Sequence, residues 1–137
     1  MRLKWLALLC LVLLAACGGD ETAPVNQVKA FVAATEARDV DAMVALMTPS
    51  SRRDAQWQLN QVMPSVTAIT YRDAQYRLEE IKDGRAYVQI AGTLVASTSD
   101  GKTVEQPIAQ LVELVQTDGT WYVAANNFQL PQDPGSN

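Results

Sequence analysis

Three Asp-Gly pairs divide the second half of the sequence and constrain its fold more than any other feature. They stand at Asp83-Gly84, Asp100-Gly101 and Asp118-Gly119. Asp-Gly readily adopts the positive φ angles that tight β-hairpins require. The segments beside these pairs alternate apolar and polar residues, as half-buried strands do. The pattern predicts an antiparallel meander of four strands that begins near Val66 and ends near Phe128.

Two irregularities mark this predicted sheet. The alternation changes parity near Asp73-Ala74, which predicts a bulge or a bend. The run from Val104 to Gln116 carries apolar residues on both faces, so we expect a central strand that is covered at least partly on both sides. An exposed apolar sheet face around Ile108–Val115 would instead favour a dimer, and the sequence leaves the oligomeric state open.

The first half of the sequence shows helical periodicity in three stretches. Apolar residues recur at helical spacing from Val25 onward. Asp39 is placed to cap a second, short helix, and Thr48 with Pro49 after it is placed to cap a third, which Pro64 ends. Three N-terminal helices packed on a curved antiparallel sheet make an α+β domain.

Composition bounds both the size of the domain and its chemistry. The chain has 137 residues, of which 48% are hydrophobic and 19% charged, as in one globular domain. We place this domain at residues 25–130, with residues 131–137 as a loose tail. Histidine is absent and both cysteines, Cys10 and Cys17, lie near the start. These counts exclude a Ser-His-Asp triad, a histidine metal site and a CxxC redox pair, and nothing in the sequence calls for a cofactor.

The beginning of the chain has the pattern of a secretory signal. Arg2 and Lys4 precede an apolar run from Leu6 to Ala16. This run is too short to cross a bilayer as a helix, because a spanning helix needs about 20 apolar residues.

Residues 14–17, Leu-Ala-Ala-Cys, resemble the bacterial lipobox. The resemblance implies cleavage between Ala16 and Cys17, removal of residues 1–16, and a diacylglycerol thioether on Cys17. The protein would then be held on a membrane by acyl chains, with residues 17–24 as a short tether.

The expected location and the net charge of the protein limit the kinds of partner that it can have. Gly18 follows the cysteine where Gram-negative lipoproteins retained in the inner membrane typically carry aspartate. The resemblance therefore implies an outer-membrane lipoprotein that faces the periplasm. Loss of Arg2 and Lys4 with the signal leaves a net charge of −6, which argues against nucleic acid and against anionic lipid surfaces.

The order of the elements resembles the nuclear transport factor 2-like superfamily, also called cystatin-like rolls. The segments that carry the resemblance are residues 28–47, 76–94 and 118–126. It implies a sheet curled around a long helix, often with a pocket at the wide end. Ketosteroid isomerases, polyketide cyclases and dehydratases have this fold and use a pocket aspartate or histidine as the base.

Four carboxylates on the predicted strands are candidates for such a base: Asp73, Glu80, Glu105 and Glu113. One of them would act as a base if it were buried beside a tyrosine hydroxyl in an open pocket. The alternative is a solvated strand face. A pocket filled by apolar side chains would exclude the enzyme; the side chains placed to fill it are Phe31, Val88, Ile90 and Leu94.

Two further polar clusters have a functional and a structural interpretation. Asp39 and Asp41 could form part of a metal site, but helix capping explains both. Arg52-Arg53-Asp54 could bind a phosphate at a helix N-terminus, or could simply be exposed residues of a first turn.

Trp57 lies half a turn away from the apolar stripe of the third predicted helix. This position predicts an exposed indole, and hence a candidate interface, or an indole partly buried against a neighbouring loop. Our first hypothesis is a non-catalytic envelope lipoprotein that binds a protein partner or a small apolar ligand. The alternative is an isomerase-like or cyclase-like enzyme with a carboxylate base.

Overall fold

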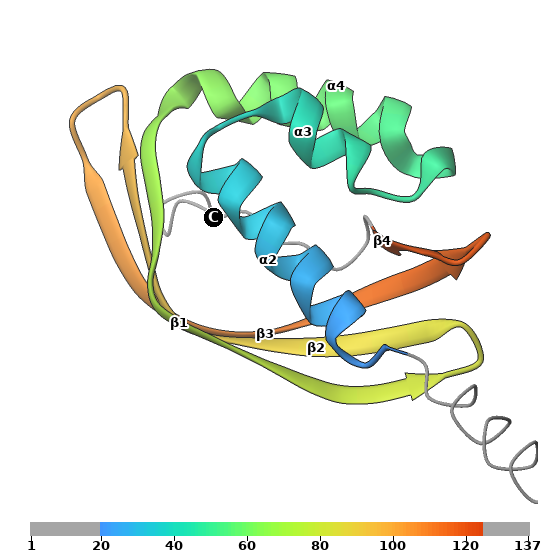
Figure 1. The fold of residues 1–137 in the computed structure, drawn as a ribbon. Coiled ribbons are helices and arrows are strands. Elements are labelled where there is room, and N and C mark those ends of the chain that lie inside the picture. The colour runs from blue at the N-terminus through green and yellow to red at the C-terminus, as the bar shows by residue number, and fades with distance from the viewer. Residues whose placement is uncertain (1–19, 125–137) are drawn as a thin grey trace, which may run out of the picture.

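The computed structural model describes residues 20–124 and confirms the α+β class. Its elements in chain order are α2 (Thr22–Glu36), α3 (Val40–Ala45), the 3-10 turn η1 (Pro49–Ser51), α4 (Arg52–Val62), the 3-10 turn η2 (Met63–Ser65), β1 (Val66–Lys82), β2 (Arg85–Thr98), β3 (Thr103–Thr117) and β4 (Thr120–Val123). The strands form one antiparallel sheet in the order β1-β2-β3-β4. The sheet curls around α2, and α3 and α4 lie across one end of it (Figure 1).

The three predicted hairpins are present at the Asp-Gly pairs. Asp83 and Gly84 join β1 to β2 with φ angles of 53° and 72°, the pair of positive values that a two-residue hairpin turn requires. Asp118 and Gly119 join β3 to β4 with φ angles of 50° and 79°. Because both turns follow from local residue chemistry, the meander could be predicted from sequence.

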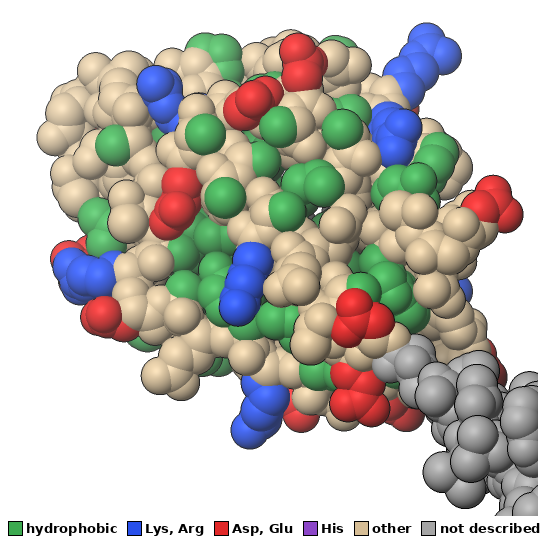
Figure 2. All heavy atoms as spheres, in the orientation of Figure 1, with side chains coloured by type: hydrophobic (Ala, Val, Ile, Leu, Met, Phe, Trp, Pro, Cys, Tyr) green, Lys and Arg blue, Asp and Glu red, His purple; other side chains and the backbone are tan. Residues whose placement is uncertain are grey.

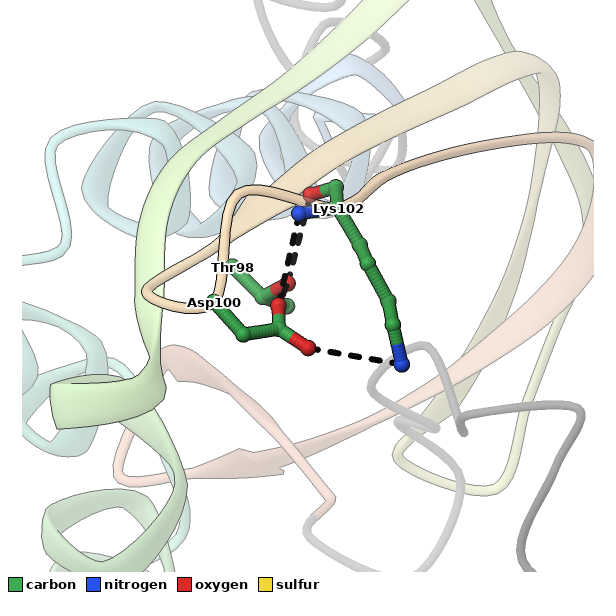
Figure 3. A network of polar contacts seen from close by, with 3 residues as sticks. All are labelled: Thr98, Asp100 and Lys102. Atoms are coloured by element: carbon green, nitrogen blue, oxygen red, sulfur yellow. Dashed lines mark hydrogen bonds and ion pairs between the residues drawn. The ribbon is translucent and has the colours of Figure 1, made fainter.

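The turn between β2 and β3 is held by a polar network on Asp100 (Figure 3). The carboxylate of Asp100 accepts a hydrogen bond from the Thr98 hydroxyl, and its Oδ1 accepts from the backbone N–H of Lys102 at 3.3 Å. The ammonium of Lys102 lies 3.4 Å from Oδ2. Hydrogen bonding by Thr98 and then by Lys102 lowers the pKa of the Asp100 carboxyl, so the network favours its charged form.

The bulge predicted near Asp73 is present and faces Gly92. The register of β1 against β2 shifts between Arg72 and Gln75. A Cβ added to Gly92 would lie 2.9 Å from the carbonyl oxygen of Arg72 and 3.1 Å from the Cα of Ala74. Only glycine lets the bulged strand come this close, and bulges of this kind bend a sheet.

The core lies between α2 and the concave face of the sheet. Val28 and Phe31 on α2 are each 1% exposed, and Val88 and Ile90 on β2 are 0% exposed. Thr35, a buried polar residue on α2, donates its hydroxyl to the carbonyl of Phe31 at 2.8 Å. The concave face is therefore closed by apolar packing along the middle of β2.

The helices depart from prediction at two points. Helix α2 begins at Thr22 rather than Val25, so the last residues of the predicted tether are helical. Pro24 fits there because the N–H groups of a first turn have no partner within the helix. The hydroxyl of Thr48 lies 2.7 Å from that of Ser51 and caps no backbone N–H, so the predicted Thr48 cap is wrong. Asp39 does cap α3, accepting from the backbone N–H of Ala42 at 3.0 Å.

The turn after α2 ties the helices to the edge of the sheet. Arg38 has a φ of 56° and donates its backbone N–H to the carbonyl of Thr35 at 2.9 Å, which closes the helix end. Its guanidinium donates to the carbonyl of Val66 at 2.8 Å. The backbone after α3 also pairs with the other edge, since Val123 donates to the carbonyl of Leu46 at 2.9 Å.

The strand β3 is central in the sheet, as expected, but its two faces are covered unequally. Val112 and Leu114 are buried on the concave face, but Leu111, which points the other way, is 46% exposed. Within residues 20–124 the helices lie on the concave side of the sheet (Figure 1), and on the convex face of β3 Val115 is half-buried while Leu111 is exposed.

Several predictions concern residues outside the described range. The strand β4 ends at Val123, and the predicted continuation to Phe128 lies outside the described residues. The signal, Ala16, Cys17 and the tail at 131–137 lie outside them too. Among residues 20–124, no helix combines the length and the apolar character that membrane crossing demands.

Candidate functional site

Trp57 projects from the outer side of α4. Ala55 and Leu59 are 8% and 5% exposed and hold the helix on the core, whereas Trp57 is 67% exposed. The indole lies opposite this buried pair because residues two apart on a helix point in nearly opposite directions. Of the two outcomes expected from sequence, the structure shows the exposed indole.

Uncharged amides make up much of the exposed side of α4. The side chains of Gln56, Gln58, Asn60 and Gln61 are all exposed. Gln56 donates to Asp41 at 3.3 Å, which links α4 to α3. The exposed side of α4 therefore carries one large apolar ring, amides that both donate and accept hydrogen bonds, and the charged Arg53 and Asp54.

The four candidate carboxylates do not meet on the concave face. Glu105 pairs with Arg72, and Glu113 pairs with Arg85, on the convex face of the sheet. Glu80 stands opposite Tyr87 on that same face, and Asp73 is exposed in the bulge with a φ of 54°. The requirement of a buried carboxylate is thus met by none of the four.

Two tyrosines do lie on the concave side, next to the end of α2. Tyr71 is 7% exposed and Tyr76 is half-buried. Burial raises the pKa of Tyr71, with smaller contributions from Tyr76 and the carboxylate of Glu36. Burial and then Glu36 also raise the pKa of Tyr76. A raised pKa keeps both hydroxyls protonated, so they suit hydrogen-bond donation rather than proton abstraction.

Glu36 and Lys29 on α2 complete this tyrosine cluster, and neither was a candidate from sequence. Glu36 accepts the backbone N–H of Tyr71 at 2.7 Å. The ammonium of Lys29 lies 5.6 Å from the centre of the Tyr76 ring, within cation–π range. Lys29 and Glu36 are two helical turns apart and therefore lie on one side of α2. The helical periodicity of the sequence did not indicate that Tyr71 and Tyr76 would lie beside them.

The two remaining polar clusters have structural partners. Asp39 caps α3 and Asp41 accepts from Gln56. Among residues 20–124, no group of three or more acidic or thiol side chains is placed to hold a metal ion. Arg53 and Asp54 are exposed, as expected, whereas Arg52 is half-buried and donates to the carbonyls of Ala45 at 3.0 Å and Met47 at 3.2 Å.

The face drawn in Figure 2 carries both basic and acidic side chains, with apolar side chains between many of them.

Comparison with solved structures identifies the fold. No family model matches the sequence, and no curated protein matches it. A protein from Novosphingobium aromaticivorans assigned as an aromatic ring hydroxylase aligns with a TM-score of 0.67 at 14% identity, over 76% of this chain and 83% of that one. A ketosteroid isomerase-like protein from Erwinia carotovora atroseptica aligns with a TM-score of 0.63 at 15% identity, over 76% and 90%.

A third structure names the fold family directly. It is a protein from Streptomyces avermitilis assigned as a dehydratase of the NTF2-like family, with a TM-score of 0.61 at 15% identity, over 77% of this chain and 91% of that one. Identities this low carry the architecture and leave activity open. With its helices, its curled four-stranded sheet and these neighbours, residues 20–124 form an α+β domain with the NTF2-like fold.

Proposed function

We propose that this protein is a lipoprotein of the bacterial cell envelope whose NTF2-like domain binds a partner without catalysing a reaction. The membrane part of the proposal rests on the Leu-Ala-Ala-Cys sequence that ends at Cys17. Acyl chains on this cysteine would hold the domain at a membrane surface, since two or more chains anchor a protein stably. Gly18 favours the outer membrane, on its periplasmic side.

The observation that carries the non-catalytic part is the filling of the concave face. Phe31, Val88 and Ile90 are at most 1% exposed, and Leu94 is 3% exposed, where an open pocket would need space. The candidate carboxylates lie on the convex face or in the bulge. A general base must reach its substrate within hydrogen-bond distance, and these carboxylates are turned away from the concave side.

Lipidation is tested by acyl labelling in the host. Wild-type protein should incorporate labelled palmitate and fractionate with the outer membrane. Cys17→Ser should lose the label and leave that fraction, while Cys10→Ser, the matched control, should keep both. Labelling that persists in Cys17→Ser would refute the anchor.

Native mass spectrometry of the purified Cys17→Ser chain tests the binding role. A bare protein mass fits a filled interior and a partner that binds at the surface. A small molecule that survives purification would instead identify an interior ligand site and reopen the enzyme alternative. The same spectrum gives the oligomeric state, which the exposed Leu111 on β3 makes worth measuring.

A further inference from the structure

Very little chain separates the domain from the cysteine of the lipobox-like sequence. Only Gly18 and Gly19 stand between Cys17 and Asp20, the first residue that the structure describes. Consecutive Cα atoms are about 3.8 Å apart, so the three steps from Cys17 to Asp20 span about 11 Å at most. Whatever path the chain takes, this length limits how far the domain can stand from Cys17.

The chain after Asp20 adds no further reach, because it is already held by the domain. Oδ1 of Asp20 accepts the backbone N–H of Thr22 at 3.1 Å and also the Thr22 hydroxyl. The carbonyl of Asp20 accepts the backbone N–H of Ala23 at 3.2 Å. In the same turn of α2, Pro24 is buried and Val25 packs against the core. The start of α2 is thus fixed to the rest of the domain.

Two contacts along α2 show which end of the domain carries this start. The carboxylate of Glu36, at the end of α2, accepts the backbone N–H of Tyr71, and the ammonium of Lys29 lies over the ring of Tyr76. Earlier residues of the helix therefore lie along later residues of β1. The start of α2 is level with the end of β1, where the turn to β2 follows (Figure 1).

We call residues 20–22 and 81–85 the tethered end. Ile81 in this end is 41% exposed, and it stands opposite the buried Ala86, so its side chain lies on the concave side of the sheet with α2. Charged residues of both signs are also exposed there: Asp20, Glu21, Lys82, Asp83 and Arg85. A surface of mixed charge suits headgroups that carry both a phosphate and an ammonium group, whereas anionic lipid attracts clusters of basic residues.

The reach of the tether is short on the scale of a membrane. A bilayer is about 40–45 Å thick with a hydrocarbon core of about 30 Å, so each headgroup layer takes about 5–8 Å. Acyl chains on Cys17 would seat this residue inside the headgroup layer. Asp20 would then lie within about 11 Å of a residue embedded among headgroups, which is no more than the diameter of one α-helix. The domain would have no room to stand clear of the membrane.

We propose that the domain stands end-on on its membrane, with the tethered end against zwitterionic lipid headgroups and Ile81 among them. The proposal rests on the proposed acylation of Cys17. The turn between β2 and β3 lies at the opposite end of the domain, since β2 has 14 residues, roughly 40 Å of strand (Figure 1). End-on contact leaves the convex face of the sheet and the exposed side of α4 open to a partner.

The test uses the protein purified from its host and reconstituted into phosphatidylcholine vesicles that contain a lipid with a nitroxide on its headgroup. A fluorophore is attached to a single new cysteine in each of three variants, Ile81→Cys, Leu111→Cys and Ser99→Cys. Ser99 is exposed in the turn between β2 and β3, and Leu111 is exposed on the convex face. We expect the nitroxide to remove most of the emission from Ile81→Cys and to leave that of the other two variants nearly unchanged.

Stronger quenching in Leu111→Cys than in Ile81→Cys would overturn the proposal by laying the convex face on the membrane. Equal quenching of all three labels, strong or weak, would overturn it as well. Because all three positions are exposed, melting temperatures close to that of wild type should show that the variants fold.

The intact mass of each reconstituted sample separates this proposal from the proposed function. A mass without acyl chains would remove the anchor and, with it, the reason for an end-on orientation. An acylated protein whose Ile81→Cys label is not quenched would refute the orientation alone and leave the anchor standing.

Discussion

The carboxylate oxygen Oε1 of Glu36, the last residue of α2, lies 2.7 Å from the backbone nitrogen of Tyr71 in β1. The two residues are 35 positions apart, and the bond joins the central helix to the edge strand of the sheet. The N–H groups of β1 that point away from β2 have no neighbouring strand to bond, and at Tyr71 a side chain takes that place.

Removing this acceptor should destabilise the domain. Glu36→Ala leaves the partly buried N–H of Tyr71 without a partner, which should cost about 1–2 kcal/mol of unfolding free energy. Glu36→Gln keeps an acceptor oxygen and should cost less. Urea denaturation gives these values, and Glu80→Ala, an exposed carboxylate on the convex face, should stay within about 0.5 kcal/mol of wild type. Equal losses for Glu36→Ala and Glu80→Ala would contradict the assignment.

Gly92→Ala should distort the contact between β2 and the bulge of β1. The added Cβ would stand 2.9 Å from the carbonyl oxygen of Arg72, and backbone cannot move aside as a flexible side chain can. We expect a loss of about 1–3 kcal/mol, as for overpacking in a core. Gly101→Ala is the control, since its φ is +84° but nothing lies within 4 Å of the new Cβ. Thermal unfolding that ranks Gly101→Ala as the more damaging change would argue against the close approach.

The stability of the domain should fall in alkali because of Tyr71. Burial raises the pKa of Tyr71 above its ordinary value of 10.0, so the unfolded chain loses this proton first. The stabilisation is complete below that ordinary value and is lost as the pH rises toward the pKa of the folded state. Tyr71→Phe should remove this part of the alkaline slope, and Tyr87→Phe, on the convex face, is the control. Denaturation series between about pH 9 and pH 11 measure the difference.

Substitution of the two tryptophans of the domain, Trp57 and Trp121, should change its stability by very different amounts. Trp121 is 9% exposed, and Trp121→Ala should cost about 3–5 kcal/mol, as truncation of a packed aromatic does. Trp57→Ala should change stability by no more than about 0.5 kcal/mol. In fluorescence, Trp57→Phe should remove the component that acrylamide quenches readily. Emission that remains as accessible after Trp57→Phe would place the exposed indole elsewhere.

Local chemistry explains why much of the architecture could be predicted. Asp83-Gly84 and Asp118-Gly119 adopt positive φ angles that few other pairs tolerate, so each fixes a hairpin without help from the rest of the chain. The cap on α3 is equally local, since Asp39 and its partner Ala42 are three residues apart. Features of this kind depend on the sequence within a few residues.

The failures of prediction have different physical causes. Glu36 gave no signal in the sequence, because its partner Tyr71 is reached only after the chain has folded back. Partial cover was expected on both faces of β3, and on the convex face residues 20–124 leave Leu111 largely exposed. The start of α2 at Thr22 was missed because Pro24, which reads as a tether residue, is acceptable in a first turn.

Glu36 and Arg38 together alter what the first half of β1 presents to other molecules. One occupies the N–H of Tyr71 and the other the carbonyl of Val66, along the open edge of the sheet. An edge whose backbone groups are already engaged is a poor template for an incoming strand. The end of α2 and the turn that follows it thus oppose edge-to-edge pairing of two sheets, which would matter most if acyl chains crowd the protein on a membrane, as proposed.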